Sequence, residues 1–360
     1  KRASVQVPAI GREGLVDPRE KELPLADIDL YMRGIVRWMN ALGIHTAMCC
    51  DGHGKRPPYV LLLSALEMEQ MELLKFCLPD GLFLRRRDRR TLVFETDRSG
   101  GIYGLLLDYA ERLHGVVRNP DLFTRHEAAA FKERHLMRWL SIPGASGREG
   151  PVRRKLRERM RFLVDRVESD SCGNVLAEVN CGDGPVVLLS AHMDVREELH
   201  PGRTIAEEGT LLRSSSGILG ADDRAGIAVA LCLCERIRRT DFRGTLKLAF
   251  TVKEEIGLIG ARNIDPSFMR DVDAAIVVDR RGKRDIVTSR GEIEPFCDPT
   301  YGRLFERAGE LAGMDDWRMT AGGSSDAAVY SRQFHIPAVN LSAGYMHEHT
   351  PMETLDYLAA

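Results

Sequence analysis

The chain has 360 residues, which is long for one ordinary domain and fits two domains of unequal size. Its 51 Lys and Arg residues nearly balance its 53 Asp and Glu residues, whereas general nucleic-acid binders carry a large basic excess. A hydrophobic share of 44% provides for a buried core, and no apolar run approaches the roughly 18 to 20 residues that span a bilayer. We therefore expect a globular protein that binds neither nucleic acid nor membrane.

The cysteines and the first residues bear on location. Residues 1–14 contain no apolar stretch long enough for a secretory signal. Eight cysteines occur at irregular spacing, and Cys77, Cys232 and Cys234 lie inside apolar runs, as reduced buried thiols do. These features predict a cytoplasmic protein.

The first third of the chain predicts a small domain. Residues 1–24 are rich in proline and charge and predict an irregular arm. Apolar residues at helical spacing then predict a helix from Ile28 to about Gly43. The next predicted elements are strands at 45–50 and 59–63, a helix at 66–76, a hairpin at 82–95 and a helix at 102–113. This order predicts an α+β domain over residues 25–124, of unknown role, with its helices on one sheet face.

The pattern loses its period near Asn119-Pro120, so a second domain is predicted over residues 125–360. Strand-like apolar runs alternate with helices there, which predicts an α/β domain with a mixed, largely parallel sheet and helices on both faces. The alternating strand-like and helical segments lie at 186–190, 225–237, 246–252, 274–278, 301–311, 326–331 and 338–341. Sites in such domains lie at the carboxyl ends of the strands.

Acidic residues and histidines follow these strands one after another. They are His192, Asp194, Asp222, Asp223, Glu254, Glu255, Asp279, His347 and His349. Any one of them could be a cap or a surface charge, but five consecutive groups favour a shared site. The neighbours Glu254 and Glu255 repel each other unless a cation or a shared proton intervenes. One of the pair can then bind an ion while the other acts as a base.

The residue types also indicate the metal. Two histidines with three or four carboxylates supply nitrogen and oxygen ligands, which suit zinc better than calcium or magnesium, with cobalt and manganese as alternatives. One bridging Asp gives two divalent metal positions, an arrangement suited to hydrolysis by a bridging water.

Residues 135–360 resemble the co-catalytic di-zinc exopeptidases, the superfamily of peptidase T-like and Aeromonas-type aminopeptidases and of related carboxypeptidases and deacylases. Single motifs are modest support, but their ordered set is specific. The motifs are Leu140-Ser-Ile-Pro-Gly-Ala-Ser-Gly-Arg-Glu149, Asp170-Ser-Cys-Gly-Asn174, Ser190-Ala-His-Met-Asp194, Leu219-Gly-Ala-Asp-Asp-Arg-Ala-Gly226, Glu254-Glu-Ile-Gly-Leu-Ile-Gly-Ala261, Gly322-Gly-Ser-Ser-Asp-Ala-Ala328 and His349-Thr-Pro-Met-Glu353.

The resemblance implies a role for each candidate. Asp222 would bridge two zinc ions, one of which is also held by His192 and Asp279 and the other by Glu255 and His349. His349 is favoured over His347 because it begins the Thr-Pro-x-Glu pattern. Glu254 would be the general base that moves a proton from the bridging water to the leaving amine, and Asp194 would orient His192. Too few residues separate Asp279 from the next helical region to form the lid domain that many relatives insert there.

These implications favour a zinc-dependent aminopeptidase that hydrolyses short peptides, with the amino-terminal domain restricting access or mediating assembly, including a homo-oligomer. One alternative is a carboxypeptidase or N-acyl amino-acid deacylase, in which Arg290 binds a substrate carboxylate. Another is an inactive hydrolase fold that serves as a binding module, although such a scaffold has no need of Glu254 and the ligand set. Further candidates for contact with substrate are Ser324, Ser325, Asp326 and His347.

Two polar segments of the small domain have simpler interpretations. The segment Cys49-Cys-Asp-Gly-His-Gly54 offers soft metal ligands, but no second pair of ligands follows it, so a tight turn between strands is favoured. The arginine-rich segment 85–90 is flanked by strand-like residues and is interpreted as the solvated tip of a hairpin.

Overall fold

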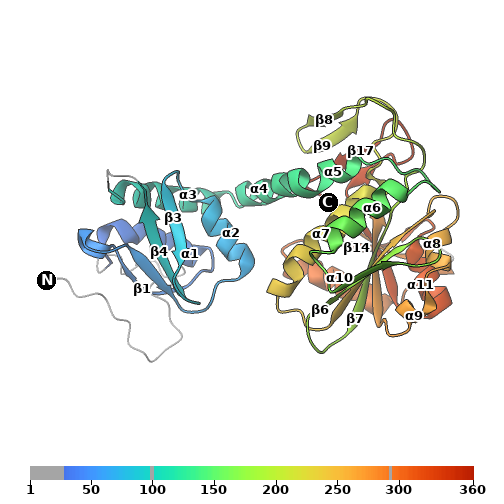
Figure 1. The fold of residues 1–360 in the computed structure, drawn as a ribbon. Coiled ribbons are helices and arrows are strands. Elements are labelled where there is room, and N and C mark those ends of the chain that lie inside the picture. The colour runs from blue at the N-terminus through green and yellow to red at the C-terminus, as the bar shows by residue number, and fades with distance from the viewer. Residues whose placement is uncertain (1–27, 98–100, 292–293) are drawn as a thin grey trace. The chain divides into compact units, whose positions relative to one another are not determined.

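The computed structural model describes residues 28–97, 101–291 and 294–360 (Figure 1). The chain forms two compact units, Lys1–His126 and Glu127–Ala360, each with hydrophobic cores of its own. The arm predicted at residues 1–24 lies outside the described residues. No helix in the described ranges is long and apolar enough to cross a bilayer.

The first unit is a four-stranded antiparallel sheet, in the order β1-β2-β4-β3, packed against helices. Its elements are η2 (Leu30–Met32), α1 (Arg33–Ala41), β1 (Thr46–Cys50), η3 (Gly52–Gly54), β2 (Tyr59–Leu62), α2 (Met68–Phe76), β3 (Leu82–Arg86), β4 (Thr91–Thr96) and α3 (Tyr103–Arg118). The α+β class predicted for this part of the chain is confirmed, and the arginine-rich segment is the tip of the β3–β4 hairpin. Helix α4 (Asp121–Phe131) crosses the junction between the units.

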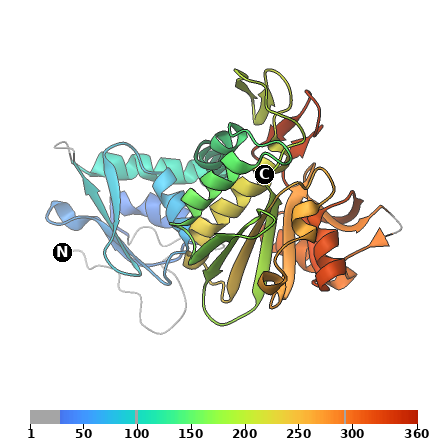
Figure 2. The same ribbon diagram turned by 45° about the vertical axis from the view of Figure 1, so that its right-hand side comes forward.

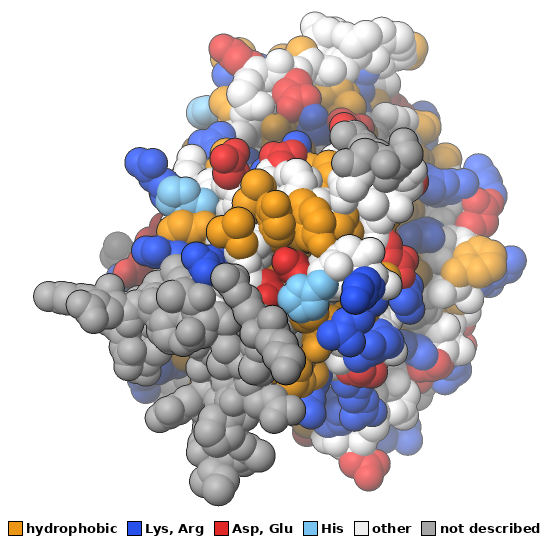
Figure 3. Space-filling model, turned by 90° about the vertical axis from the view of Figure 1, so that its left-hand side faces the viewer, with side chains coloured by type: hydrophobic (Ala, Val, Ile, Leu, Met, Phe, Trp, Pro, Cys, Tyr) orange, Lys and Arg blue, Asp and Glu red, His pale blue; other side chains and the backbone are white. Residues whose placement is uncertain are grey.

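Strand β2 shows how this sheet is built, because its side chains alternate between the two faces. Val60 and Leu62 are buried in the core with residues of α1, α2 and α3. Tyr59 and Leu61 point to the opposite face, where they line a cavity of about 390 Å³ together with arginines of the hairpin. Hydrophobic side chains lie beside Lys and Arg side chains on the surface of this unit that Figure 3 shows.

The second unit is an α/β domain around a nine-stranded mixed sheet, in the order β13-β12-β15-β11-β7-β10-β6-β5, with β14 paired to β12. Strand β7 lies parallel to both β10 and β11, and β11 lies parallel to β15. The strands are β5 (Arg166–Ser169), β6 (Val175–Asn180), β7 (Val186–His192), β10 (Thr245–Thr251), β11 (Ala274–Arg280), β12 (Asp285–Arg290), β13 (Glu294–Pro295), β14 (Arg318–Gly322) and β15 (Ala338–Ser342).

Helices cover both faces of this sheet, as predicted (Figure 2). In β7, Leu189 and Ala191 pack into the core under α6 and α7, whereas Leu188 packs into the core under α8, α9 and α11. The helical elements are η4 (Lys132–Leu136), α5 (Met137–Leu140), α6 (Gly150–Met160), α7 (Ala221–Arg236), η5 (Ile237–Arg239), α8 (Ile259–Arg262), α9 (Pro266–Met269), α10 (Pro299–Leu311) and α11 (Asp326–Phe334).

A second, antiparallel sheet in this unit was not predicted. It has the order β16-β17-β9-β8 and consists of β8 (Ile205–Glu208), β9 (Leu211–Ser214), β16 (Tyr345–Met346) and β17 (Thr354–Asp356). Strands of two to four residues carry too little periodicity to stand out in a sequence. This sheet anchors both ends of the segment between β16 and β17, which contains His349.

Candidate metal centre

The predicted metal ligands converge where three parallel strands end. His192 is the last residue of β7, Asp279 lies near the end of β11, and Glu254 and Glu255 follow β10. Because these strands are neighbours in the sheet, their carboxyl ends bring the four side chains to one edge. Asp222 reaches the same point from the start of α7, and His349 from the segment that the small sheet holds.

Asp222 lies at the middle of the cluster. The Nε2 atom of His192 lies 2.9 Å from Oδ1 of Asp222, and Nε2 of His349 lies 3.1 Å from its Oδ2. Two sets of ligand atoms, each within 4.8 Å of one another, therefore share this carboxylate. One set is His192, Asp222 and Asp279, and the other is Asp222, Glu255 and His349.

The electrostatics of the cluster favour positive charge. Hydrogen bonds to Asp222 and Glu255 raise the pKa of His349 to about 10. Burial opposes a charge on His192, but Asp279 and the hydrogen-bonded carboxylates raise its pKa well above the usual value. Burial beside other carboxylates raises the pKa of Asp279 to about 7. So much negative charge in a buried place is stabilised by protons or by a cation.

One buried oxygen atom of the cluster has no hydrogen-bond partner, which bears on whether a metal ion fits here. Oε1 of Glu255 is buried and has no hydrogen-bond partner, although its other oxygen lies 2.8 Å from Nε2 of His349. A buried carboxylate oxygen without a partner is costly, and an ion coordinated there would satisfy it. The nitrogen and oxygen donors of the two sets suit a divalent transition metal.

Carboxylates around the ligands hold the backbone that presents them. Glu353 accepts the N–H groups of Gly220 and Ala221 at 2.8 Å and that of Asp222 at 3.1 Å. Asp223 accepts the N–H of His192 at 3.1 Å. Glu353 belongs to a motif that the sequence singled out, but its role shows only in contacts with residues far away in the chain.

Asp194 joins two parts of the site. Its backbone oxygen lies 3.0 Å from Nδ1 of His192, and its carboxylate lies 3.5 Å from the same nitrogen. The carboxylate also accepts the N–H groups of Glu254 and Glu255, at 3.0 and 3.2 Å, and the hydroxyl of Ser146 at 2.6 Å. Asp194 therefore orients the His192 ring and fixes the turn that carries both glutamates. The contact with Ser146 was not predicted, because nothing in the sequence links the two segments.

The cluster opens into a cavity of about 760 Å³. Glu254 lines it beside Glu255 and His349, and burial, together with nearby Asp279 and Asp326, raises the pKa of Glu254 well above that of an ordinary carboxyl group. Four arginines share the lining: Arg196, Arg262, Arg290 and Arg332.

The predicted substrate contacts divide into two groups. Arg290 and Ser324 line the cavity, whereas Ser325, Asp326 and His347 do not. Ser325 caps α11, and Asp326 is buried with its Oδ2 accepting the hydroxyl of Thr251 at 2.6 Å. His347 is exposed and belongs to neither set of metal ligands.

Comparison with known proteins agrees with this geometry. Residues 199–359 match the family described as M42 glutamyl aminopeptidase. A protein of Acetivibrio thermocellus named "Putative aminopeptidase" is 21% identical over 309 residues, covering 61% of this chain and 92% of that protein. A peptidase T-like protein of Yersinia pestis is 36% identical over 72 residues, which are 20% of this chain and 17% of that protein.

Solved structures share the fold of the second unit. A tripeptidase from Staphylococcus aureus superposes with a TM-score of 0.55 and 17% identity, covering 64% of this chain and 94% of its own. PhTET1-12s, described as a dodecamer, superposes with a TM-score of 0.51 and 18% identity, covering 62% and 94%. The family match, the ordered motifs and the fold lead to one conclusion. Together they support a metal-dependent aminopeptidase activity for the second unit, which is similar to the co-catalytic zinc exopeptidases.

Proposed function

We propose that this unit removes amino-terminal residues from short peptides with two divalent ions, preferably zinc, bridged by Asp222. The observation that carries the proposal is the sharing of one carboxylate by the two sets of ligand atoms. His192 and Asp279 complete one site, and Glu255 and His349 complete the other. Bound there, the ions would supply a water of lowered pKa and a Lewis acid for the scissile carbonyl.

Glu254 is the residue of this chain that moves the proton. It lines the cavity but belongs to neither set of ligand atoms, so its carboxylate is free to face the substrate. Its raised pKa suits a group that accepts a proton from the attacking water near neutral pH and then returns it to the leaving amine. Asp194 positions it through the N–H of Glu254.

The arginines of the cavity indicate which peptides bind. A guanidinium group recognises a carboxylate, so Arg290 and Arg332, which both pair with Glu294, suit substrates that carry a carboxylate. A cavity of about 760 Å³ suits a short peptide, whose terminal carboxylate supplies this group, and an acidic side chain would serve equally. The match to a family described as glutamyl aminopeptidase supports an acidic preference.

Two substitutions test the assignment of roles. We expect Glu254→Gln to keep both ions and to lower kcat about 100- to 10,000-fold, because only the proton carrier is lost. Asp222→Ala should release metal, because both sites lose a ligand. Metal content by mass spectrometry and turnover of a tripeptide measure the two effects. Turnover close to that of the unsubstituted chain in Glu254→Gln would remove Glu254 from the mechanism.

A peptide library tests the substrate class. Mass spectrometry of the products should show residues lost from free amino ends, with acetylated peptides left intact. Short peptides with a carboxyl-terminal amide should be cleaved more slowly than their free acids. Shortening from the carboxyl end, or equal rates for amides and acids, would contradict the proposed placement of the substrate.

The same comparisons and the cysteines support two further proposals, on assembly and on location. We infer that copies of this chain associate into a homo-oligomer, since a relative of the same fold is a dodecamer and Leu304 and Leu311 are exposed on α10. Light scattering in solution tests this. All eight cysteines are free, which supports the reducing cytoplasm.

A further inference from the structure

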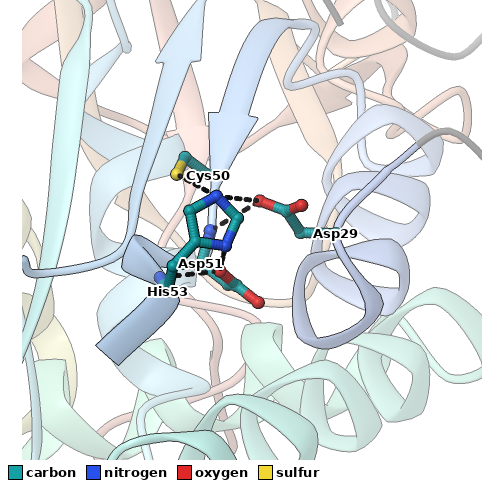
Figure 4. A group of neighbouring side chains, drawn as sticks. All are labelled: Asp29, Cys50, Asp51 and His53. Carbon is teal, nitrogen blue, oxygen red and sulfur yellow. Dashed lines mark hydrogen bonds and ion pairs between the residues drawn. The ribbon is translucent and has the colours of Figure 1, made fainter. Parts of the chain in front are cut away.

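Four metal-binding side chains meet in the first unit, far along the chain from the aminopeptidase site. They are Asp29, which precedes η2, Cys50 at the end of β1, and Asp51 and His53 in the turn at η3 (Figure 4). The cysteine-containing segment lacked a second pair of ligands in the sequence. The fold supplies the missing carboxylate from Asp29.

Three atoms of this cluster face one another as ligands of a metal do. Nε2 of His53 lies 3.8 Å from Sγ of Cys50 and 4.0 Å from Oδ2 of Asp29. Ligand atoms around a tetrahedral zinc ion lie about 3.3 to 3.8 Å from one another, given bond lengths of about 2.0 to 2.3 Å. A single proton on Nε2 of His53 can be donated to Sγ of Cys50 or to Oδ2 of Asp29, but not fully to both. A cation bound between the three atoms would contact all of them.

The other ring nitrogen is held in the way that metal-bound histidines require. Nδ1 of His53 lies 3.0 Å from Oδ1 of Asp51, on the opposite side of the ring from the sulfur (Figure 4). A carboxylate that accepts the Nδ1 proton leaves Nε2 free to bind a metal and makes it a better ligand. Asp51 also accepts the backbone N–H of His53 at 2.9 Å, so it fixes both the ring and its backbone.

Two hydrogen-bond donors lie against the buried sulfur of Cys50. The N–H of Gly52 and a guanidinium nitrogen of Arg56 donate to the sulfur at 3.4 and 3.5 Å. Cys50 is only 2% exposed, so a substrate cannot reach its sulfur, which argues against a role as a nucleophile. The His53 side chain is 53% exposed, so an ion can reach the cluster from solvent through this residue.

Two further features set this cluster apart from an ordinary turn. Asp29 occupies the position that caps η2, yet its side chain makes no capping hydrogen bond and instead accepts the N–H of Asp51 at 3.1 Å. His53 has φ of 50°, in the left-handed region that glycine usually occupies, between two glycines that share it. The Asp29 carboxylate thus lies against the turn, with the same oxygen 4.0 Å from Nε2 of His53.

We propose that Asp29, Cys50 and His53 bind a divalent ion of the zinc class, with Asp51 orienting the His53 ring. One sulfur, one nitrogen and one oxygen ligand suit zinc or cobalt better than magnesium or calcium. The ion would connect the start of α1 to the turn between β1 and β2. The proposal does not depend on the function of the second unit, whose candidate ligands contain no sulfur.

Cobalt distinguishes the two kinds of site in the full-length chain. Absorption by thiolate-to-cobalt charge transfer in the near ultraviolet can come only from a sulfur ligand, so the aminopeptidase site does not contribute. We expect this absorption on addition of Co²⁺, with three ions bound per chain. Cys50→Ser should remove the absorption and one ion and leave peptide hydrolysis unchanged.

Matched variants complete the test. Cys49→Ser, at the neighbouring residue, should keep the absorption. Asp51→Asn should keep it but weaken cobalt binding about 10- to 100-fold, as loss of a supporting carboxylate does. His53→Gln, at a half-exposed side chain, should bind no third ion while circular dichroism shows a folded chain. Two bound ions without charge-transfer absorption, or absorption that Cys50→Ser leaves intact, would overturn the proposal.

Discussion

Several carboxylates of the second unit act on the backbone and not on the proposed metals. Asp194 holds the turn of Glu254 and Glu255, and Glu353 holds the start of α7. Burial raises the pKa of Glu353 to about 7, against the hydrogen bonds from the three backbone N–H groups, which lower it. The positions of Glu255 and Asp222 therefore depend on carboxylates from distant parts of the chain.

Glu353 provides a test at this scale. Glu353→Gln replaces one accepting oxygen by an N–H₂ group, which cannot accept the N–H groups of the turn and faces them instead. We expect Asp222 to lose its fixed position and the affinity for metal to fall about 10- to 100-fold, as measured by competition with a chelating dye. The neighbouring exposed variant Met352→Gln should bind metal as tightly as the unsubstituted chain. Equal affinities in both variants would rule out a supporting role for Glu353.

At the scale of elements, α7 must lie very close to β11 for the two sets of ligands to share Asp222. A Cβ atom at Gly226 of α7 would lie 2.2 Å from the carbonyl oxygen of Val278 in β11 and 2.6 Å from the Asp223 carboxylate. Only glycine permits this approach, which brings Asp222 next to Asp279.

Gly226→Ala should therefore separate the two elements. We expect a loss of about 1 to 3 kcal/mol in the free energy of unfolding from the overpacked contact, together with a lower metal content. Urea denaturation and metal analysis measure the two effects. Gly115→Ala is the matched control in α3, where a Cβ meets nothing within 4 Å, and it should stabilise its helix by about 0.5 to 1 kcal/mol. A Gly226→Ala chain with unchanged stability would contradict the close-packing argument.

The long strands of the second unit could be predicted from the sequence, whereas its short strands could not. Strands such as β7 and β10, with seven residues each and charged residues shortly after them, were recognisable, and so were the side chains that the fold brings together at their carboxyl ends. The sheet that holds His349 was missed because its strands are too short to show a period. The soft ligands around Cys50 were noted in the sequence but set aside, because Asp29 comes close to them only in the folded chain.

At the scale of the whole molecule, each unit has its own core and its own candidate metal site. Zinc should therefore stabilise each unit separately, by about 2.7 kcal/mol when its free concentration is 100 times the dissociation constant. In differential scanning calorimetry we expect Asp222→Ala to abolish the zinc-induced shift of the second unit and Cys50→Ser to abolish that of the first. A single substitution that removed both shifts would show that the sites are not independent.

The central claim is that two ions share Asp222. The most direct test is a crystal structure of the zinc-loaded protein with anomalous scattering recorded at the zinc edge. We predict two peaks on either side of the Asp222 carboxylate, about 3.5 to 4 Å apart, one beside His192 and Asp279 and the other beside Glu255 and His349. A single peak, or two peaks that do not both contact Asp222, would contradict this account.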